Sequence, residues 1–172
     1  DETYVGGKEA NRHESKRLAL GRGAIGKAPV IAGRQRDTGR VRAEVHPSVS
    51  TRSAMGFAYR NVAPGSIIHT DESAIYNPVG GLIYKHERIN HSAGEYVRGN
   101  VTTNGIESVF AVMKRGLIGV YHHASPKHLH RYVNEFAFRL NDGDVSHHTM
   151  ERLASMFGAA IGRRLTYKEL IA

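Results

Sequence analysis

Three carboxylates occupy positions in the sequence that a metal site could use. Asp1 lies on a predicted strand that a Gly-Gly turn ends, Asp71 ends a short apolar strand, and Glu107 lies on the polar side of a predicted helix. Carboxylate oxygens suit Mg²⁺ or Mn²⁺, and two such ions about 3.5–4 Å apart can activate an attacking oxygen and stabilise a leaving one. Ions of this kind bind few protein groups and leave coordination positions for phosphate and water. Taken singly, each acid is more simply explained as a solvated surface group.

The helix that carries Glu107 places a base on the same face. Lys114 follows Glu107 by seven residues, nearly two helical turns, so the two positions lie about 10 Å apart along the axis. Asn104 precedes Glu107 by three residues and shares that side. Such a face can present polar groups to a phosphate, although Lys114 and Arg115 are also explained as an ordinary solvated helix end. The opposite stripe is apolar and can pack on a sheet: Ile106, Val109, Phe110, Met113 and Leu117.

The charge balance favours a polyanionic partner. The 172 residues include 24 Lys and Arg against 16 Asp and Glu, a formal net charge of +8. From Lys8 to Arg42, ten basic residues accompany three acidic ones, and the loop at about residues 8–27 is either simply solvated or an arm that neutralises phosphates. The absence of Cys excludes disulfides and thiolate metal sites within this sequence. No apolar run approaches the roughly 20 residues that cross a bilayer.

Histidines recur in the second half of the sequence: His122, His123, His128, His130, His147 and His148. Their spacing matches no standard zinc ligand set and lacks the usual Cys or acid partner. Contact with phosphate is one interpretation, and plain surface or capping roles are another. Tyr121 and Tyr132 are better explained as aromatic residues of the core or its edge than as stacking platforms for bases.

The pattern of apolar residues predicts the elements that position these groups. The predicted strands span residues 1–6, 29–33, 41–45, 66–71 and 86–90. The predicted helices span residues 51–62, 104–117, 125–140 and 149–161. Ser125 is expected to cap the third helix, with Pro126 in its first turn. Strands first and helices last predict an α/β fold in one domain over residues 1–172, with a mixed sheet flanked by helices.

Several strings of residues together resemble the catalytic domain of the DDE transposases of bacterial insertion sequences, in the ISXO2-like or IS1595 group. The strings run in the same order over nearly the whole chain: Asp1 to Lys8, Thr70 to Glu72, Ile89 to Ser92, Thr103 to Phe110, Met113 to Gly116, Gly119 to His122 and Arg131 to Asn141. The agreement of several specific strings is a stronger indication than any single acid.

The resemblance implies an RNase H-like fold, which is a mixed five-stranded sheet with three antiparallel first strands, flanked by helices. It also implies a catalytic carboxylate triad of Asp1, Asp71 and Glu107 that binds two divalent ions, Mg²⁺ or Mn²⁺. A basic residue seven positions after the glutamate belongs to the same motif, and here it is Lys114. Lys114 is therefore expected to position the phosphate backbone as part of the catalytic set.

The implied reaction has two steps, and DNA is the implied partner. Water first cuts one strand at the end of the element and frees a 3′ hydroxyl, which then attacks a phosphodiester of the target DNA. The residues expected to contact DNA are Asn104, Lys114, Arg115, His122, His123 and Lys127. The protein is expected to act in the bacterial cytoplasm as a homo-oligomer assembled on DNA, without a membrane partner.

Two rival acids and two rival functions accompany this interpretation. Glu2 and Glu72 each adjoin a predicted ligand, but side chains alternate along a strand, so Glu2 should face away from Asp1. An inactive or domesticated relative that only binds DNA is disfavoured, because three acids near phosphate would weaken a pure binder. An RNase H-like nuclease without strand transfer is equally compatible with the residues themselves.

The sequence opens in mid-pattern at Asp1, without Met or a targeting segment. We therefore expect it to be a piece of a longer polypeptide, with a DNA-recognition region upstream. The α-amino group of Asp1 would place a charge of up to about +1 beside the metal site near neutral pH. We expect metal to bind more weakly here than in a chain extended upstream.

Overall fold

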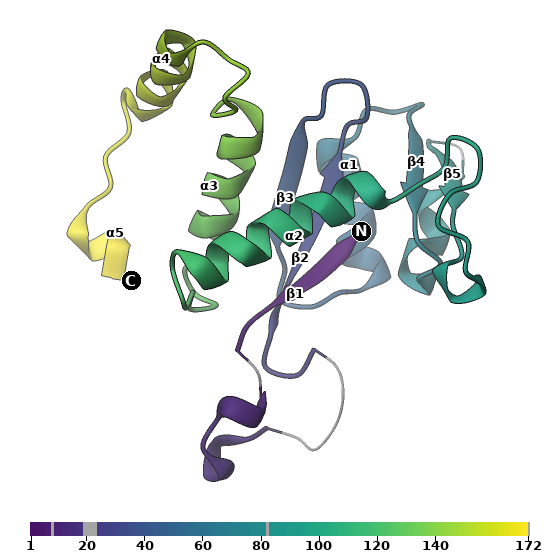
Figure 1. The fold of residues 1–172 in the computed structure, drawn as a ribbon, viewed down its shortest axis with the longest axis horizontal. Helices are drawn as coiled ribbons and strands as arrows, with labels where there is room; N and C mark the ends of the chain where they lie inside the picture. The colour runs from purple at the N-terminus through teal and green to yellow at the C-terminus, as the bar shows by residue number, and fades with distance from the viewer. Residues whose placement is uncertain (8, 19–23, 82, 172) are drawn as a thin grey trace.

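The computed structural model describes residues 1–7, 9–18, 24–81 and 83–171, which form an α/β fold (Figure 1). The described strands are β1 (Glu2–Val5), β2 (Ala28–Arg34), β3 (Val41–Val45), β4 (Ile67–Thr70) and β5 (Lys85–Arg88). The described α-helices are α1 (Thr51–Asn61), α2 (Asn104–Gly119), α3 (Leu129–Asn141), α4 (Thr149–Ala160) and α5 (Tyr167–Ile171). Of the predicted basic segment, Lys8 and Arg22 lie outside the described residues.

The first three strands form an antiparallel sheet in the order β1-β2-β3, as the resemblance implies. Thr3 pairs with Val30, and Val30 pairs in turn with Val45. The ladder extends to Asp1, whose nitrogen donates to the carbonyl of Ala32 at 3.2 Å and whose carbonyl accepts from the Ala32 amide at 3.0 Å. These two hydrogen bonds fix the backbone of Asp1 against the central strand of the sheet.

The free edge of β3 is covered by a side chain from the end of α3. The Asn141 amide nitrogen donates to the carbonyl of Val41 at 2.9 Å, and its amide oxygen accepts from the Val41 amide at 2.7 Å. One side chain therefore satisfies both backbone groups of an edge residue, and it ties α3 to the sheet.

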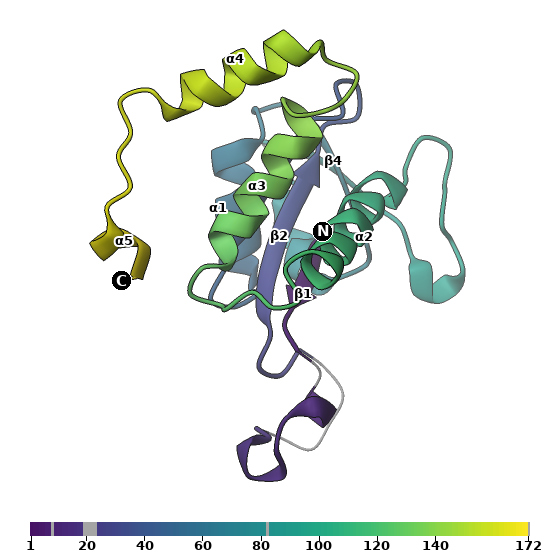
Figure 2. The ribbon, with the colours of Figure 1, turned by 60° about the vertical axis from the view of Figure 1, so that its left-hand side comes forward.

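Helices cover both faces of this sheet, with α2 and α3 on one side and α1 on the other (Figures 1 and 2). The core on the α2 side contains the whole stripe predicted on that helix: Ile106, Val109, Phe110, Met113 and Leu117. Tyr121 and Tyr132 pack at the edge of this core, as predicted. On the other face, the ring of Phe57 in α1 lies so close to Gly33 in β2 that a Cβ atom there would stand 3.3 Å from it.

Strands β4 and β5 form a separate parallel pair. No backbone ladder joins this pair to the three-stranded sheet within the described residues, so the predicted single five-stranded sheet appears as three antiparallel and two parallel strands. The three-stranded sheet and the β4–β5 pair are joined by contacts between side chains instead of backbone hydrogen bonds. The Tyr76 hydroxyl binds Glu2 of β1 there, and a cleft separates β2 from β4.

The helix predicted from residue 125 begins later than expected, at Leu129. Residues 126–128 form a turn in which the amide of His128 donates to the carbonyl of Ser125 at 3.0 Å. His128 then takes the N-cap position that the sequence assigned to Ser125, and that assignment was wrong. The turn absorbs Pro126, so the proline stands ahead of the helix and outside its first turn.

The C-terminal helices stand apart from the sheet (Figure 2). Helix α4 matches the prediction for residues 149–161 within one residue, yet none of its residues is buried. Its exposed apolar side chains include Met150, Met156 and Phe157. The short helix α5 has no counterpart among the predicted elements. None of the helices in the described part of the chain is both long and apolar enough to span a bilayer.

Candidate active site

Asp1 lies on the face of the three-stranded sheet that α2 covers. Side chains alternate along β1, so Asp1 shares a face with Thr3, which is buried. The Asp1 Oδ1 atom accepts a hydrogen bond from the Glu2 amide at 2.7 Å. The residue lines a cleft of about 800 Å³ together with Thr70 of β4 and Thr103, which precedes α2. The strand therefore presents Asp1 to a cavity shared by three elements.

Glu2 points to the opposite face, as the alternation predicts. Its Oε2 atom accepts a hydrogen bond from the hydroxyl of Tyr76, which lies in a 3₁₀ helix at Ala74–Val79. Burial, followed by the hydrogen bond to Glu2, raises the pKa of Tyr76, so the hydroxyl stays protonated and continues to donate. Glu2 therefore serves as a contact between the two sheets and is turned away from α2.

Asp71 stands directly after β4, as predicted, and its Oδ1 atom accepts from the Ser73 amide at 3.1 Å. It lies within electrostatic reach of the α-amino group of Asp1. Burial lowers the pKa of that amino group, while Glu2 and Asp71 partly oppose the shift. Burial therefore reduces the positive charge that the sequence predicts at this end of β1, and Asp71 acts on the same amino group.

Glu72 anchors the loop that follows β5. Its Oε2 accepts from the His91 amide at 2.9 Å, and its Oε1 accepts from the Ser92 amide at 3.1 Å and the Ser92 hydroxyl at 2.5 Å. The Ser92 hydroxyl, together with the backbone amides, lowers the pKa of Glu72 to about 2. Both carboxylate oxygens are occupied, so Glu72 acts as a structural anchor for this loop.

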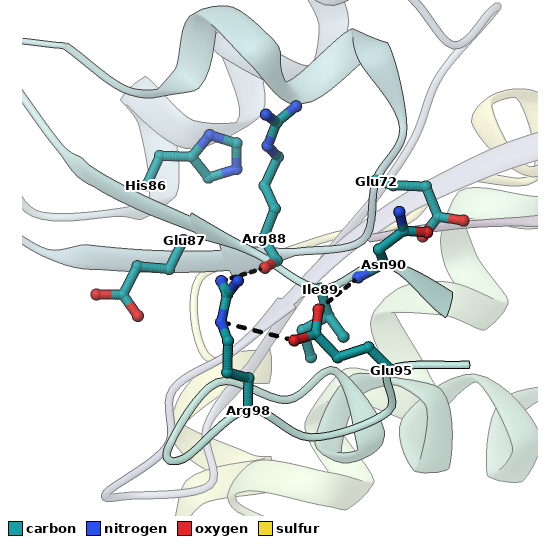
Figure 3. A pocket seen from close by; sticks show the side chains of 8 residues that line it. All are labelled: Glu72, His86, Glu87, Arg88, Ile89, Asn90, Glu95 and Arg98. Carbon is teal, nitrogen blue, oxygen red and sulfur yellow. Dashed lines mark hydrogen bonds and ion pairs between the residues drawn. The ribbon is translucent and has the colours of Figure 1, made fainter. Parts of the chain in front are cut away.

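A second hollow lies beside the same loop and shows how it is held (Figure 3). Arg98 donates to the carbonyl of Arg88 at 2.7 Å, and its Nε lies 3.8 Å from a carboxylate oxygen of Glu95. The other Glu95 oxygen accepts from the Asn90 amide at 3.1 Å. These contacts stabilise the loop from which His91 projects.

Glu107 is held at the start of α2 by Thr103 and His91. The Thr103 hydroxyl donates to Glu107 Oε1 at 2.7 Å. His91 Nε2 lies 2.9 Å from that hydroxyl and 3.6 Å from the same carboxylate oxygen. Thr103 is only 3% exposed, whereas half of the Glu107 side chain is exposed. The sequence analysis assigned no role to Thr103 or His91, although both stand in strings that carry the family resemblance.

The three predicted metal ligands do not form one closed cage. Within the part of the chain that the structure describes, no three His, Cys, Asp or Glu side chains are grouped so that they could hold a metal ion. The chemistry of the donors nevertheless fits Mg²⁺ or Mn²⁺, because Asp1, Asp71 and Glu107 are all carboxylates. Each of them is hydrogen-bonded through one oxygen, and the described contacts leave its second oxygen available. Negatively charged carboxylates repel one another, and this repulsion favours an arrangement in which each carboxylate accepts a hydrogen bond from a different donor. The triad stays a prediction.

The residues predicted to contact DNA are all exposed: Asn104, Lys114, Arg115, His122, His123 and Lys127. The first three lie on α2, with Lys114 two turns after Glu107. The Lys127 Nζ donates to the carbonyl of Ile171 at 3.0 Å, so part of the C-terminal segment contacts this end of the molecule. Within the described structure none of the six lines the cleft that Asp1 lines. Their DNA contacts stay a prediction.

A sequence model of the ISXO2-like transposase domain matches residues 1–141, which run from Asp1 to the last residue of α3. The chain belongs to the ISXO2-like transposase domain family. The match confirms the resemblance to the IS1595 group of DDE transposases. A comparison with curated proteins gives no match.

The transposase domain contains every residue discussed for the site, while α4 and α5 lie beyond the matched residues. Because transposases act on DNA, membership of this family indicates DNA as the partner of this domain. Four arginines line this cleft with Asp1: Arg34, Arg36, Arg40 and Arg42. These arginines belong to the basic segment predicted from the sequence, but their position beside Asp1 depends on the pairing of β1 with β2, which the sequence does not show.

Proposed function

We propose that this domain is the catalytic core of a transposase that cuts and joins DNA strands at the ends of an insertion element. The observation that carries the proposal is the contrast between Asp1 and the rival acids. Asp1 faces α2 and lines the cleft. Glu2 is bound by Tyr76 on the opposite face, and Glu72 anchors the loop after β5 with both of its oxygens. Glu2 therefore differs from Asp1 in the face to which it points, and Glu72 differs in having both carboxylate oxygens bound.

In this proposal, Asp1, Asp71 and Glu107 would hold two Mg²⁺ or Mn²⁺ ions through their available oxygens. Such ions, when bound, activate the attacking oxygen and stabilise the leaving oxygen of a phosphodiester displacement. Lys114 lies about 10 Å along α2 from Glu107 and would hold a backbone phosphate in register with the acids. Orientation and charge stabilisation would supply most of the acceleration, so each group must be placed accurately.

The exposed side of α2 and the turn after it would form one contact surface for DNA. Its residues are those predicted from the sequence: Asn104, Lys114, Arg115, His122, His123 and Lys127. The basic members neutralise phosphates, and counterions leave the DNA when they do so. Binding should therefore weaken steeply as salt is raised.

We also propose the finer architecture and assembly that the resemblance implies. The antiparallel and parallel sheets would be the two parts of an RNase H-like sheet in one domain, since the bond between Tyr76 and Glu2 joins them. The domain would act in the bacterial cytoplasm behind an upstream DNA-recognition region. It would assemble as a homo-oligomer on DNA, and the exposed apolar side chains of α4 supply a surface for that assembly.

A strand-transfer assay tests the function. The full-length protein is incubated with a pre-cut DNA end, a target plasmid and Mn²⁺, and the products are separated by size. Joined product is the expected result. Cleavage without joining would support a nuclease that lacks strand transfer, and binding without either product would support an inactive DNA-binding relative. Either of these results contradicts the proposal.

A further inference from the structure

The C-terminal tail, residues 162–171, returns to the domain after α4 and brings α5 beside the start of α3 (Figures 1 and 2). The Lys127 Nζ donates to the carbonyl of Ile171 at 3.0 Å, and the Arg131 Nη2 donates to the carbonyl of Glu169 at 3.0 Å. Both carbonyls lie in the last turn of α5, where carbonyl groups have no partner within the helix and carry partial negative charge. Two cations of the transposase domain therefore hold the tail in place.

This return brings together basic side chains from two distant parts of the sequence. Residues 127–131 and 163–169 contain five Lys or Arg side chains and one acid. We call the five basic side chains the tail cluster: Lys127, Arg131, Arg163, Arg164 and Lys168. Arg131 is half-buried, and the other four are exposed. The tail cluster is therefore a basic surface that solvent and a ligand can reach.

The acid in these two segments, Glu169, is engaged by the start of its own helix. Its Oε2 atom accepts from the Thr166 amide at 2.7 Å and from the Thr166 hydroxyl at 2.8 Å. These bonds to Thr166, with a smaller contribution from the charge of Arg131, lower the pKa of Glu169. Glu169 therefore stabilises α5, and the described contacts leave the side chains of Arg163, Arg164 and Lys168 available to a ligand.

The positive charges of the tail cluster act on one another and on their neighbours. Desolvation, followed by the charges of Arg131 and Lys127, lowers the pKa of His128, the residue that lies between them in sequence. Cations gathered on one surface repel one another, and a polyanion removes this repulsion when it binds. A phosphate backbone suits such a surface, because each neutralised phosphate also releases its counterions.

The tail cluster lies at the opposite end of α2 from Glu107. Helix α2 ends at Gly119, twelve residues after Glu107, which corresponds to about 18 Å along the axis. Because duplex DNA advances about 3.4 Å per base pair, a duplex lying along α2 from Glu107 reaches the tail cluster after about five base pairs. The tail itself lies beyond residues 1–141, which the family model matches. The tail cluster is therefore separate from the carboxylate site.

We propose that the C-terminal tail binds DNA together with the start of α3, and that the tail cluster holds the phosphate backbone about five base pairs from the carboxylate site. The inference rests on the proposed function and goes beyond it, because it assigns DNA binding to a segment outside the transposase domain. Lys127 belongs both to the surface of α2 and to the tail cluster, so the two surfaces are continuous. Arg163 and Arg164 can each bind a phosphate through two parallel hydrogen bonds.

The test measures DNA binding in the full-length protein without divalent metal, so that it does not depend on catalysis. Binding of a fluorescent DNA duplex is followed by anisotropy over a series of salt concentrations. One variant combines Arg163→Gln with Arg164→Gln, and a second carries Lys168→Gln alone. The double variant should bind about tenfold more weakly and reduce the slope of log K against log salt by about 2. Lys168→Gln should reduce the slope by about 1.

Arg52→Gln is the matched control, because Arg52 is an exposed arginine at the start of α1, on the other side of the sheet (Figure 1). It should keep the affinity and slope of the unaltered protein. Thermal unfolding of each variant verifies its fold, and the substituted side chains are all exposed.

The results distinguish failure of this inference from failure of the proposed function. If folded tail variants keep the original affinity and slope, the inference is wrong while the proposed function stands. Tighter DNA binding by the tail variants would also overturn the inference, since the tail would then compete with DNA for the start of α3. Loss of binding to phosphatidylserine vesicles, with DNA binding unchanged, would assign the tail cluster to a membrane. If the unaltered protein binds no DNA, the proposed function itself fails.

Discussion

Thr103 connects the buried interior to the exposed carboxylate of Glu107. Its hydroxyl donates to Glu107 at 2.7 Å and lies 2.9 Å from the ring nitrogen of His91. Groups that orient a metal ligand commonly contribute 10- to 100-fold to metal affinity or activity. Thr103 is only 3% exposed, so we expect it to act through the hydrogen bonds of its hydroxyl and not by contacting a ligand.

We expect Thr103→Val to lower Mn²⁺ affinity by about 10- to 100-fold, because valine keeps the shape but removes the donor to Glu107. Isothermal titration with Mn²⁺ measures the change. Thr103→Ser is the control and should restore most of the affinity, since its hydroxyl can reach the same oxygen. Equal affinity in the valine variant and the unaltered protein would show that Thr103 does not position a ligand.

Glu135 provides a pH-dependent prediction that is independent of the site. A hydrogen bond from the Tyr121 hydroxyl, with a further contribution from Arg139, holds the pKa of Glu135 below its usual value of 4.5. Because the folded pKa is lowered, this stabilisation is fully present above the unfolded value and is lost as the pH falls through the folded value. The stability advantage over Glu135→Gln should therefore be constant above about pH 4.5 and shrink below it.

Denaturant unfolding of the two proteins across this pH range measures the advantage. A carboxyl titration by NMR supplies the second readout, in which Tyr121→Phe should raise the pKa of Glu135 towards its usual value. A stability difference that grows on acidification would contradict the assigned sign.

At the scale of elements, the crossing of α2 over α3 depends on a glycine. A Cβ atom on Gly116 would overlap the ring of Phe136, which is buried in the core between the helices. We expect Gly116→Ala to cost about 1–3 kcal/mol of unfolding free energy, because the ring or the helices must shift to relieve the overlap. Chemical denaturation measures this value.

Gly119→Ala is the matched control on the same helix. A Cβ atom there meets nothing within 4 Å, and alanine is the better helix former, so stability should be unchanged or slightly higher. Equal losses in both variants would show that the close approach of Gly116 to Phe136 is not the cause of the effect.

The described strands and the helices α1, α2 and α4 lie within two residues of their predicted bounds, because local apolar patterning determines each of them. The apolar stripe of α2 was predicted correctly because this helix packs on the sheet with a period near 3.6 residues. The N-terminus of α3 was wrong because a backbone turn at residues 126–128 competes with capping by Ser125. The structure has two sheets where a single sheet was predicted. The approach of β4 to β1 depends on side chains such as Tyr76, and the periodicity of apolar residues along a strand carries no information about such contacts.

In the candidate site, the sequence predicted features that depend on neighbouring residues and missed those that depend on contacts between residues far apart in the chain. The alternation of Glu2 and Asp1 across β1 is local, and the sequence predicted it. The anchoring of Glu72 by the loop after β5 joins residues 19 and 20 positions apart, and the contact of His91 with Glu107 spans another loop. Such contacts follow from tertiary packing, so the sequence could not predict which acids are occupied by structural bonds.

At the scale of the whole molecule, the C-terminal helices expose much apolar surface. Met150 is 65% exposed, Phe157 is 60% exposed and Ile161 is 79% exposed. These residues lie beyond the part of the chain that the family match covers. In the proposed homo-oligomer, a second copy covers this surface.

We expect Phe157→Lys to weaken self-association at least tenfold, because burying one phenylalanine contributes about 1.5–3 kcal/mol. Sedimentation velocity over a range of protein concentrations measures the association, with and without DNA. Val97→Lys is the control, since Val97 is also exposed but lies on the loop after β5. If both variants associate like the unaltered protein, α4 is not the oligomer surface.

In the proposed function, Asp1, Asp71 and Glu107 act together on DNA, while Glu2 and Glu72 stabilise the fold. The most direct measurement is Mn²⁺-dependent cleavage of an element end by the full-length protein carrying Asp1→Asn, Asp71→Asn or Glu107→Gln. Glu2→Gln and Glu72→Gln serve as neighbouring controls. Each of the first three variants should lose cleavage and still bind DNA, whereas both controls should continue to cut. Cleavage at the normal rate by any of the first three variants would contradict the proposed function.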